Sequence, residues 1–270
     1  MKISEIFKRI FVERYCLVCG EPISYDVPEP FCDECIEEWN SFKDIKCRSC
    51  GRVQRFCTCL PRYARKINHS IVGWCYFYDV EENGNIRQLF KYLKRQYDRQ
   101  VIDFCTDKMK QAVLAIAKSR HLDLNRFFVT YSPRSKTNVN KYGFDQSRKL
   151  ALSLAKKLGL RVKVIFENKG EQEQKGLNKK ERIQNAAETY KFIDGSVSDG
   201  DRFLLVDDIL TTGATMYACA LQLYKNGAES VVPVVFARDN YVTKGDRNNV
   251  KRNSKYNFAG AAKGFVRNGS

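Results

Sequence analysis

Two adjacent carboxylates, Asp207 and Asp208, stand between an apolar run and a loop of small and hydroxyl-bearing residues. The apolar run spans residues 203–206, and the loop contains Thr211, Thr212, Gly213, Ala214 and Thr215. A short apolar run of this kind is typical of a buried parallel strand, and the amphipathic segment after the loop is predicted to be a helix. The chemistry is therefore expected in a strand-to-helix turn.

The loop suits an anion, whereas the acids suit a sugar. Free backbone N–H groups at a helix N-terminus, together with the helix dipole, favour phosphate. Gly213 would let the backbone approach the anion, and the threonine hydroxyls can add hydrogen bonds. Carboxylates accept hydrogen bonds from sugar hydroxyls, or hold a divalent cation directly or through water. The stretch therefore predicts a sugar-phosphate site.

Eight of the eleven cysteines lie between residues 16 and 59. They form four close pairs: Cys16 and Cys19, Cys32 and Cys35, Cys47 and Cys50, Cys57 and Cys59. A C-x2-C turn supplies two thiolates with a geometry that suits tetrahedral zinc, so the pattern predicts structural Zn2+. Two sites divided near residue 40 are the simplest arrangement. Interleaved pairing, one site with spare thiols, and a redox-active thiol pair are the alternatives.

Strand and helix patterns alternate along the rest of the chain. Strands are predicted at 70–80, 127–131, 161–166, 203–207 and 230–237, and helices at 85–95, 98–119, 144–158, 178–188 and 214–225. This alternation predicts an α/β fold, a parallel sheet flanked by helices, with its ligand at the carboxyl ends of the strands. The expected division is an N-terminal helix and cysteine-rich module over 1–60, a short basic linker over 60–69, an α/β domain over 70–238, and a basic, disordered tail over 239–270.

Two polar segments lie where they could complete the site. Arg134 and Lys136 follow the strand at 127–131 and could meet a pyrophosphate group, or form a solvated turn. Residues 171–180 lie between two predicted strands, which favours an active-site loop over a disordered linker.

The net charge and hydropathy of the chain limit the classes of partner that can be expected. The 270 residues carry a formal net charge of +16, which suits an anionic partner such as nucleic acid, or simply solubility beside a phosphate site. No run approaches the roughly 18 apolar residues of a spanning helix. Residues 1–15 lack the apolar core of a signal peptide, so a cytoplasmic location is expected. Their helical apolar spacing favours packing on the protein over binding at a membrane surface.

Residues 203–216 resemble the 5-phosphoribosyl-1-pyrophosphate (PRPP) motif of type I phosphoribosyltransferases. In that family the acidic pair holds the ribose 2′- and 3′-hydroxyls, and the loop after it binds the 5-phosphate. The resemblance implies that Asp207 and Asp208 position the ribose during transfer.

Further stretches resemble one subgroup, the ComF family. Residues 141–146, KYGFDQ, are similar to its GFNQ segment, with Asp145 in place of Asn, and residues 174–185, QKGLNKKERIQN, are similar to its Q-x-GL-x4-R-x2-N loop. Residues 79–97 stand where that family carries a basic helix, and the cysteine-rich N-terminus is also its arrangement. The resemblance implies a link to natural competence, in which incoming single-stranded DNA is handled, with a competence helicase as a partner.

The leading hypothesis is a phosphoribosyltransferase-type transferase that binds PRPP with Mg2+ and carries a zinc module. Arg134 and Lys136 would face pyrophosphate, and a loop over 175–182, which includes Arg182, would close over the reaction. One alternative is a non-enzymatic single-stranded-DNA-binding protein that uses the basic helix at 87–95. Another is a regulator that senses PRPP. The acceptor base is not indicated by the sequence.

Overall fold

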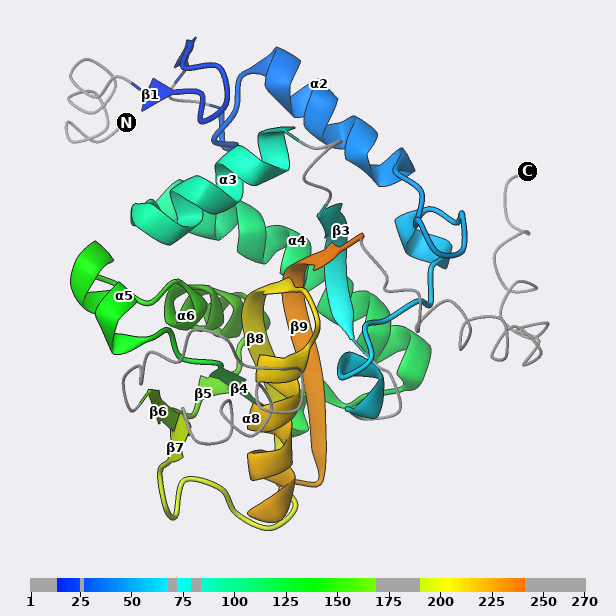
Figure 1. Cartoon of the computed structure of the whole chain (residues 1–270), viewed down its shortest axis with the longest axis vertical. Helices are drawn as coiled ribbons and strands as arrows, with labels where there is room; N and C mark the ends of the chain where they lie inside the picture. Colours follow the sequence, from blue (N-terminus) through cyan, green and yellow to red (C-terminus); the bar gives the residue numbers. More distant parts are fainter. Residues whose placement is uncertain (1–13, 25–26, 68–71, 79–83, 169–189, 241–270) are drawn as a thin grey trace, which may run out of the picture.

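A parallel five-stranded β-sheet lies at the centre of the computed structural model (Figure 1). The structure describes residues 14–24, 27–67, 72–78, 84–168 and 190–240. The strands lie in the order β3–β9–β8–β4–β5, and all neighbours are parallel. Their bounds are β3 Gly73–Tyr78, β4 Phe127–Tyr131, β5 Arg161–Val162, β8 Arg202–Leu210 and β9 Ser230–Asp239. The predicted α/β class with a parallel sheet is confirmed.

Helices cover both faces of this sheet (Figure 1). Helices α3, α4 and α6 pack against one face, and α8 packs against the other. The short helix α5 precedes α6. The bounds are α3 Gly84–Arg95, α4 Arg99–Arg120, α5 Lys136–Tyr142, α6 Gln146–Leu158 and α8 Ala214–Lys225. The helices predicted near 85–95, 98–119, 144–158 and 214–225 are therefore present, whereas α5 was not predicted.

Alternate side chains of β8 enter two separate hydrophobic cores. Leu204 and Val206 join the core under α3, α4 and α6. Phe203 and Leu205 join the core under α8. Because successive strand residues point to opposite faces, a central parallel strand is apolar at every position. This explains the uninterrupted apolar run that precedes the acidic pair.

The cysteine-rich segment is divided between the same two cores. Its first part contains β1, β2 and α2, and Trp39 of α2 stacks in the first core against Phe236 of β9, with ring centroids 6.0 Å apart. Its second part, from Cys47 to Ile67, packs in the core under α8. The bounds are β1 Arg14–Tyr15, β2 Pro22–Ile23 and α2 Asp33–Ser41. The two halves therefore lie on opposite faces of the sheet.

Strand β8 is longer than predicted, and this changes the setting of the acids. The expected strand ended at 207, but β8 continues to Leu210 because β9 stays paired with it as far as Arg238. Asp207 and Asp208 consequently belong to the strand and not to the turn after it. Their backbone is held by the ladder, which fixes the direction of both side chains.

The single strand predicted at 161–166 is wrong. Only Arg161–Val162 joins the sheet, as β5 at its edge. Phe166–Asn168 forms β6, which pairs antiparallel with an unpredicted strand, β7, at Tyr190–Phe192. Between them Val164 is 45% exposed, so the chain leaves the sheet there. The partner of β6 lies more than twenty residues away in sequence, and local patterns do not indicate such a pairing.

Residues 60–67 are not the linker predicted for 60–69. Leu60, Ala64 and Ile67 are buried in the core under α8, and Tyr63 is buried in a stack with Tyr217 of that helix. A short 3-10 helix spans Ala64–Lys66. The basic residues between them hid this apolar spacing in the sequence.

Several predictions lie outside the described residues: the N-terminal helix at 1–13, the loop at 175–182, the helix at 178–188, and the tail from 241. Within the described part, β9 runs to Asp239, and Asn240 is buried, so the chain remains packed to that point. No described helix has the length and apolar character needed to cross a membrane.

Candidate functional site

The acidic pair lies at the carboxyl end of β8, in the middle of the sheet. The turn after β4 reaches the same edge, because the backbone N–H of Ser132 donates to the Val206 carbonyl at 3.2 Å. The loop after β8 then enters α8. The acids, the turn after β4 and the loop thus meet where parallel α/β sheets hold ligands.

Asp207 is held by hydroxyl and backbone donors. The Ser147 hydroxyl of α6 donates to Asp207 Oδ1 at 3.0 Å, and the Asp208 N–H donates to the same oxygen at 2.9 Å. Burial raises the pKa of Asp207 to about 7, with repulsion by Asp208 as the next cause and hydroxyl donors opposing it. This carboxyl therefore exchanges its proton near neutral pH and can accept hydrogen bonds when ionised.

Asp208 has a cation and an amide against its second oxygen. Lys94 Nζ lies 3.5 Å from Asp208 Oδ2, and Gln146 Nε2 lies 3.5 Å from the same atom. The Gln146 Oε1 atom is buried and has no hydrogen-bond partner among the described residues. A buried acceptor without a donor is costly, which favours a ligand donor at this position.

Lys94 differs from the other basic residues of its helix, although its side chain is also half-exposed. The basic residues of the helix at 87–95 were assigned together to a DNA-facing surface. In the structure Lys94 pairs with Asp208, and its carbonyl accepts from Arg134 NH1 at 2.8 Å. Because a helix turns through 100° per residue, neighbouring basic residues point in different directions. Lys94 belongs to the acidic site, whereas Arg87, Lys91 and Arg95 are exposed.

The loop before α8 depends on Gly213. This residue is the N-cap of the twelve-residue helix and has a φ of +78°, a conformation that favours glycine. A Cβ there would lie 2.8 Å from the backbone nitrogen of Ala64. The sequence suggested room for an anion on this side, but the space belongs to the segment that follows the second cysteine group. Neighbouring backbone N–H groups at the helix start are the donors that an anion would use.

The hydroxyl residues of the loop are arranged around that helix start. Thr211 and Thr212 are exposed, and Ala214 and Thr215 are half-buried in the first turn of α8. The Thr212 hydroxyl accepts from the Ala214 N–H at 3.3 Å. The five predicted loop residues therefore lie together at one helix N-terminus.

Arg134 is anchored and not part of a solvated turn. Its backbone N–H donates to Asp145 Oδ2 at 2.8 Å, and its guanidinium lies 4.6 Å from the Tyr142 ring centroid. Burial lowers the pKa of Arg134 from its usual value. Lys136, by contrast, is exposed at the first residue of α5. Asp145 also accepts from the Arg148 N–H at 3.1 Å, so its carboxylate caps α6 and fixes the turn.

Arg182, the remaining residue assigned to the ligand, lies outside the described residues. The described residues that flank the segment containing Arg182 are paired, because Asn168 of β6 lies opposite Tyr190 of β7.

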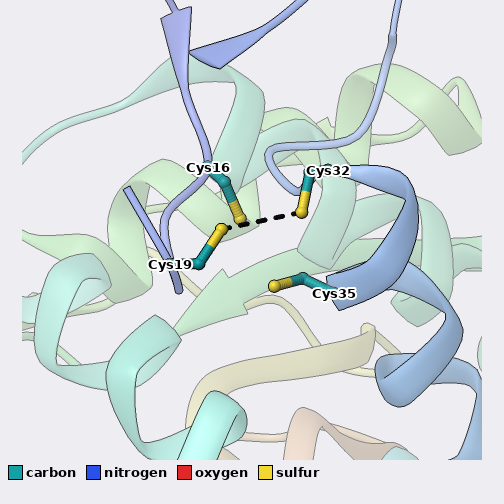
Figure 2. A group of neighbouring side chains, drawn as sticks. All are labelled: Cys16, Cys19, Cys32 and Cys35. Carbon is teal, nitrogen blue, oxygen red and sulfur yellow. Dashed lines mark hydrogen bonds between the residues drawn. The ribbon is translucent and has the colours of Figure 1, made fainter. Parts of the chain in front are cut away.

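The eight cysteines form two groups of four, divided near residue 40. Within each group the sulfur atoms all lie within 4.8 Å of one another. Figure 2 shows Cys16, Cys19, Cys32 and Cys35 converging from the turn after β1 and the start of α2, with the Cys19 and Cys32 sulfurs 3.6 Å apart. The second group contains Cys47, Cys50, Cys57 and Cys59. The simplest predicted pairing is the one found.

Four convergent sulfurs are a donor set that fits zinc. Burial raises the pKa of the Cys16 thiol, but hydrogen bonds from the backbone of Cys19, Cys32 and Val18 outweigh it and lower that pKa to about 7. In the second group, hydrogen bonds from Cys57 and Cys59 lower the pKa of Cys47 well below its usual value. In each group one thiol, Cys16 or Cys47, is thus shifted toward the thiolate form that binds metal, whereas burial raises the pKa of Cys35 and hydrogen bonds with Cys47 and Cys57 raise that of Cys59.

Fold and site together define a class of protein. Residues 139–266 match the family model of the phosphoribosyl transferase domain, a region that contains the acidic pair and the loop after it. This region is therefore similar to a phosphoribosyl transferase domain, and the five-stranded parallel sheet flanked by helices is consistent with the fold of that class.

Two relatives extend the comparison. The orotate phosphoribosyltransferase of Pyrococcus abyssi is 28% identical over 166 residues, which cover 59% of this chain and 87% of that protein. The solved structure of the adenine phosphoribosyltransferase from Thermoanaerobacter pseudethanolicus is 15% identical, with a TM-score of 0.32, and the match covers 57% of this chain and 85% of that one.

Three site residues were missed by analysis of the sequence. Lys94, Gln146 and Ser147 contact the acids from helices about 60 to 115 residues earlier in the chain. Gln146 belongs to the KYGFDQ stretch, which resembles a family segment and could have indicated it. Ser147 and Lys94 have no comparable motif of their own.

Proposed function

We propose that this protein binds PRPP together with Mg2+ and transfers its 5-phosphoribosyl group, as a phosphoribosyltransferase of the ComF type. The observation that carries the proposal is the placement of Asp207 and Asp208 at the carboxyl end of β8, directly before a glycine-capped helix start. The match of this region to the phosphoribosyl transferase domain supports it.

The acids would position the ribose. Asp207 and Asp208 would accept hydrogen bonds from its 2′- and 3′-hydroxyls, and the Gln146 Oε1 without a partner supplies a further acceptor nearby. The loop from Thr211 to Thr215 would bind the 5-phosphate through backbone N–H groups and hydroxyls. Both ends of the sugar would then be fixed, which lowers the entropic cost of reaching the transition state.

The pyrophosphate would leave on the side of the turn after β4. Arg134, Lys136 and Lys94 supply positive charge around that turn, and Arg182 would add another charge from the segment between β6 and β7. Bound Mg2+ would neutralise pyrophosphate as it departs. As C1 of the ribose becomes cationic, the leaving phosphates gain charge, and stabilising that charge would provide most of the rate enhancement.

Zinc in the two cysteine groups would have a structural role. The resemblance to ComF proteins supports a place in competence and DNA uptake, with a competence helicase as the partner class. The acceptor of the phosphoribosyl group would be found by following pyrophosphate release against a panel of bases.

The direct test is calorimetric titration of PRPP with Mg2+ into the wild type and the Asp207→Asn/Asp208→Asn double variant. The variant keeps side-chain size and removes charge-assisted hydrogen bonds to ribose. Its affinity should fall at least tenfold, about 1.4 kcal/mol. The matched control is Glu37→Gln/Glu38→Gln, which removes two exposed adjacent charges on α2 and should leave binding unchanged. Equal affinity in the double Asn variant would rule out the ribose assignment, and no binding by the wild type would rule out the proposal.

A second candidate function is binding of single-stranded DNA. The observation that favours it is the exposed basic side of α3, formed by Arg87, Lys91 and Arg95, in a chain with a net charge of +16. A basic helix surface can follow a phosphate backbone. This candidate needs no transfer chemistry, so it survives a failure of the PRPP test.

Salt dependence of DNA affinity distinguishes this candidate. The Arg87→Ala/Lys91→Ala/Arg95→Ala variant should flatten the slope of log affinity against log salt by roughly 0.7 for each lost phosphate contact. Lys94→Ala is an internal control, because Lys94 is paired with Asp208 and should leave the slope unchanged. Lys118→Ala/Arg120→Ala, at exposed positions near the end of α4, is the surface control. Equal slopes in all variants would reject α3 as the DNA surface.

A further inference from the structure

Arg238, near the end of β9, is a fully buried arginine beside the second cysteine group. Its Nη1 donates to the Cys59 carbonyl. Its Nη2 lies 3.5 Å from Cys47 Sγ and 3.8 Å from Cys57 Sγ. The guanidinium therefore touches three of the four residues of that group, although it comes from a strand about 180 residues later.

Among the described residues, no carboxylate forms an ion pair with the Arg238 guanidinium, and its Nε atom has no hydrogen-bond partner there. The Trp74 and Phe77 rings each lie 4.9 Å from the guanidinium carbon and offset part of the cost of burial. A buried cation still costs several kcal/mol unless an anion compensates it.

Within the described part of the chain, the cysteines are the remaining groups beside Arg238 that can supply negative charge. Four neutral thiols would supply none. Four thiolates around one divalent ion carry a net charge of about −2. The positive charge of the neighbouring Arg238 would reduce the net charge of the buried centre to about −1. Because Cys47 and Cys59 are buried, water screens little of the charge of this centre.

We propose that Arg238 is the buried counter-ion and positioning residue of a zinc–thiolate centre formed by Cys47, Cys50, Cys57 and Cys59. This inference rests on the zinc part of the proposed function and is independent of PRPP binding. It makes β9 a structural part of the second metal centre. Arg238 holds the thiolates by charge and the Cys59 carbonyl by a hydrogen bond.

A second contact from the same strand end supports this arrangement. Asn240 accepts from the Arg48 N–H at 3.1 Å and donates to the Lys46 carbonyl at 3.1 Å. The turn that carries Cys47 is thus held on both sides of the cysteine. Partners that orient metal ligands in this way commonly raise metal affinity ten- to hundredfold.

The test is zinc release from the intact protein to a chromogenic chelator, followed together with Trp74 fluorescence in a Trp39→Phe background, because the chain has two tryptophans. Trp74 reports on the second centre, because Arg238 lies over its ring. Wild type should release two zinc ions per chain slowly. Arg238→Met should release one of them at least tenfold faster, with a change in Trp74 emission, and Arg238→Lys should be intermediate because it keeps the charge but loses the bidentate geometry.

Arg202→Met is the matched control. Arg202 is the first residue of β8, at the opposite edge of the sheet from Arg238, and it pairs with Glu229. It should release both ions at the wild-type rate. A folded Arg238→Met protein that holds two zinc ions with wild-type release kinetics would overturn the proposal. If Arg238→Met does not fold, Arg238→Lys decides: wild-type release overturns the proposal, and faster release of one ion supports it.

Metal removal gives an independent prediction. Once zinc is removed, Arg238 loses most of the negative charge beside it, so Arg238→Met should lower the melting temperature of the metal-free protein by less than it lowers that of the zinc-loaded protein. An equal or larger loss in the metal-free protein would contradict the counter-ion role. Wild type without zinc in the second group would defeat the metal proposal itself, and intact PRPP binding in the same sample would show that the transferase proposal stands apart from it.

Discussion

The proton on Asp207 links the chemistry of the site to the stability of the fold. The folded protein raises the pKa of Asp207 to about 7, mainly through burial, whereas an aspartate in an unfolded chain titrates near 3.9. The folded state therefore binds this proton more tightly than the unfolded state. Its contribution to stability is fully present at low pH and is lost as pH rises from about 4 to about 7.

Asp207→Asn should remove this dependence. The free energy of unfolding of the variant, relative to wild type, should increase between pH 4 and pH 7 and level off above pH 7. The gain at pH 8 should be about 1 kcal/mol or more, since one pKa unit corresponds to about 1.36 kcal/mol. Urea unfolding at several pH values measures it, with Asp199→Asn at an exposed position as the control. Parallel pH profiles of variant and wild type would show that Asp207 titrates normally.

The individual residues of the site differ in how readily they can be predicted from the sequence. Asp207, Asp208 and Gly213 are recognisable because their types recur at fixed offsets within one strand-to-helix turn. Lys94, Ser147 and Gln146 are not, because their approach to the acids depends on how α3 and α6 cross the sheet. Arg238 is hidden for the same reason, since a basic residue at the end of an apolar strand is usually expected at the surface.

At the scale of elements, the loop before α8 is fixed by a segment that follows the second cysteine group. Gly213 has a φ of +78°, and a Cβ on it would meet the Ala64 nitrogen at 2.8 Å. Gly213→Ala should therefore combine backbone strain with a clash. The expected loss of stability is more than the roughly 1 kcal/mol of the conformation alone, and PRPP affinity should fall as the helix start moves.

Gly143→Ala is the matched control for this prediction. Gly143 has a φ of +77°, but a Cβ there has nothing within 4 Å, so that variant carries only the conformational strain. Denaturant unfolding and calorimetric PRPP titration of the two variants separate strain from clash. Equal losses in both would mean that Ala64 yields easily and does not support the loop.

Elements were predictable where their pattern is local. The helices at 98–119 and 214–225 were located within about one residue, because apolar periodicity and end residues lie within the segment itself. The failures concern pairing over long distances. Strand β8 is extended by its ladder with β9, β6 depends on β7, and residues 60–67 are buried by contact with α8. Each outcome depends on a partner that a sequence window does not contain.

For the whole molecule, the two cysteine groups act from opposite sides of one sheet. Cys16 and Cys35 belong to the core that contains Trp39 and Phe236, and Cys47 and Cys59 belong to the core that contains Trp74. Strands β8 and β9 contribute side chains to both cores, so metal in either group would stabilise a core that contains these strands. We propose on this ground that the described residues between 14 and 240 unfold as one cooperative unit, although a separate module over 1–60 is expected from the sequence.

Chelation of zinc tests this proposal, because the chain has only two tryptophans, one in each core. Trp74→Phe leaves Trp39 to report on the first core, and Trp39→Phe leaves Trp74 to report on the second. Both variants should melt in a single transition, and chelator should lower both melting temperatures by at least about 5 °C, equivalent to roughly 1–2 kcal/mol for a domain of this size. The Cys16→Ser/Cys19→Ser variant should shift the Trp74 transition as well as that of Trp39, since the cores share strands. A Trp39 transition that moves alone, with Trp74 unaffected, would instead establish an independent N-terminal module.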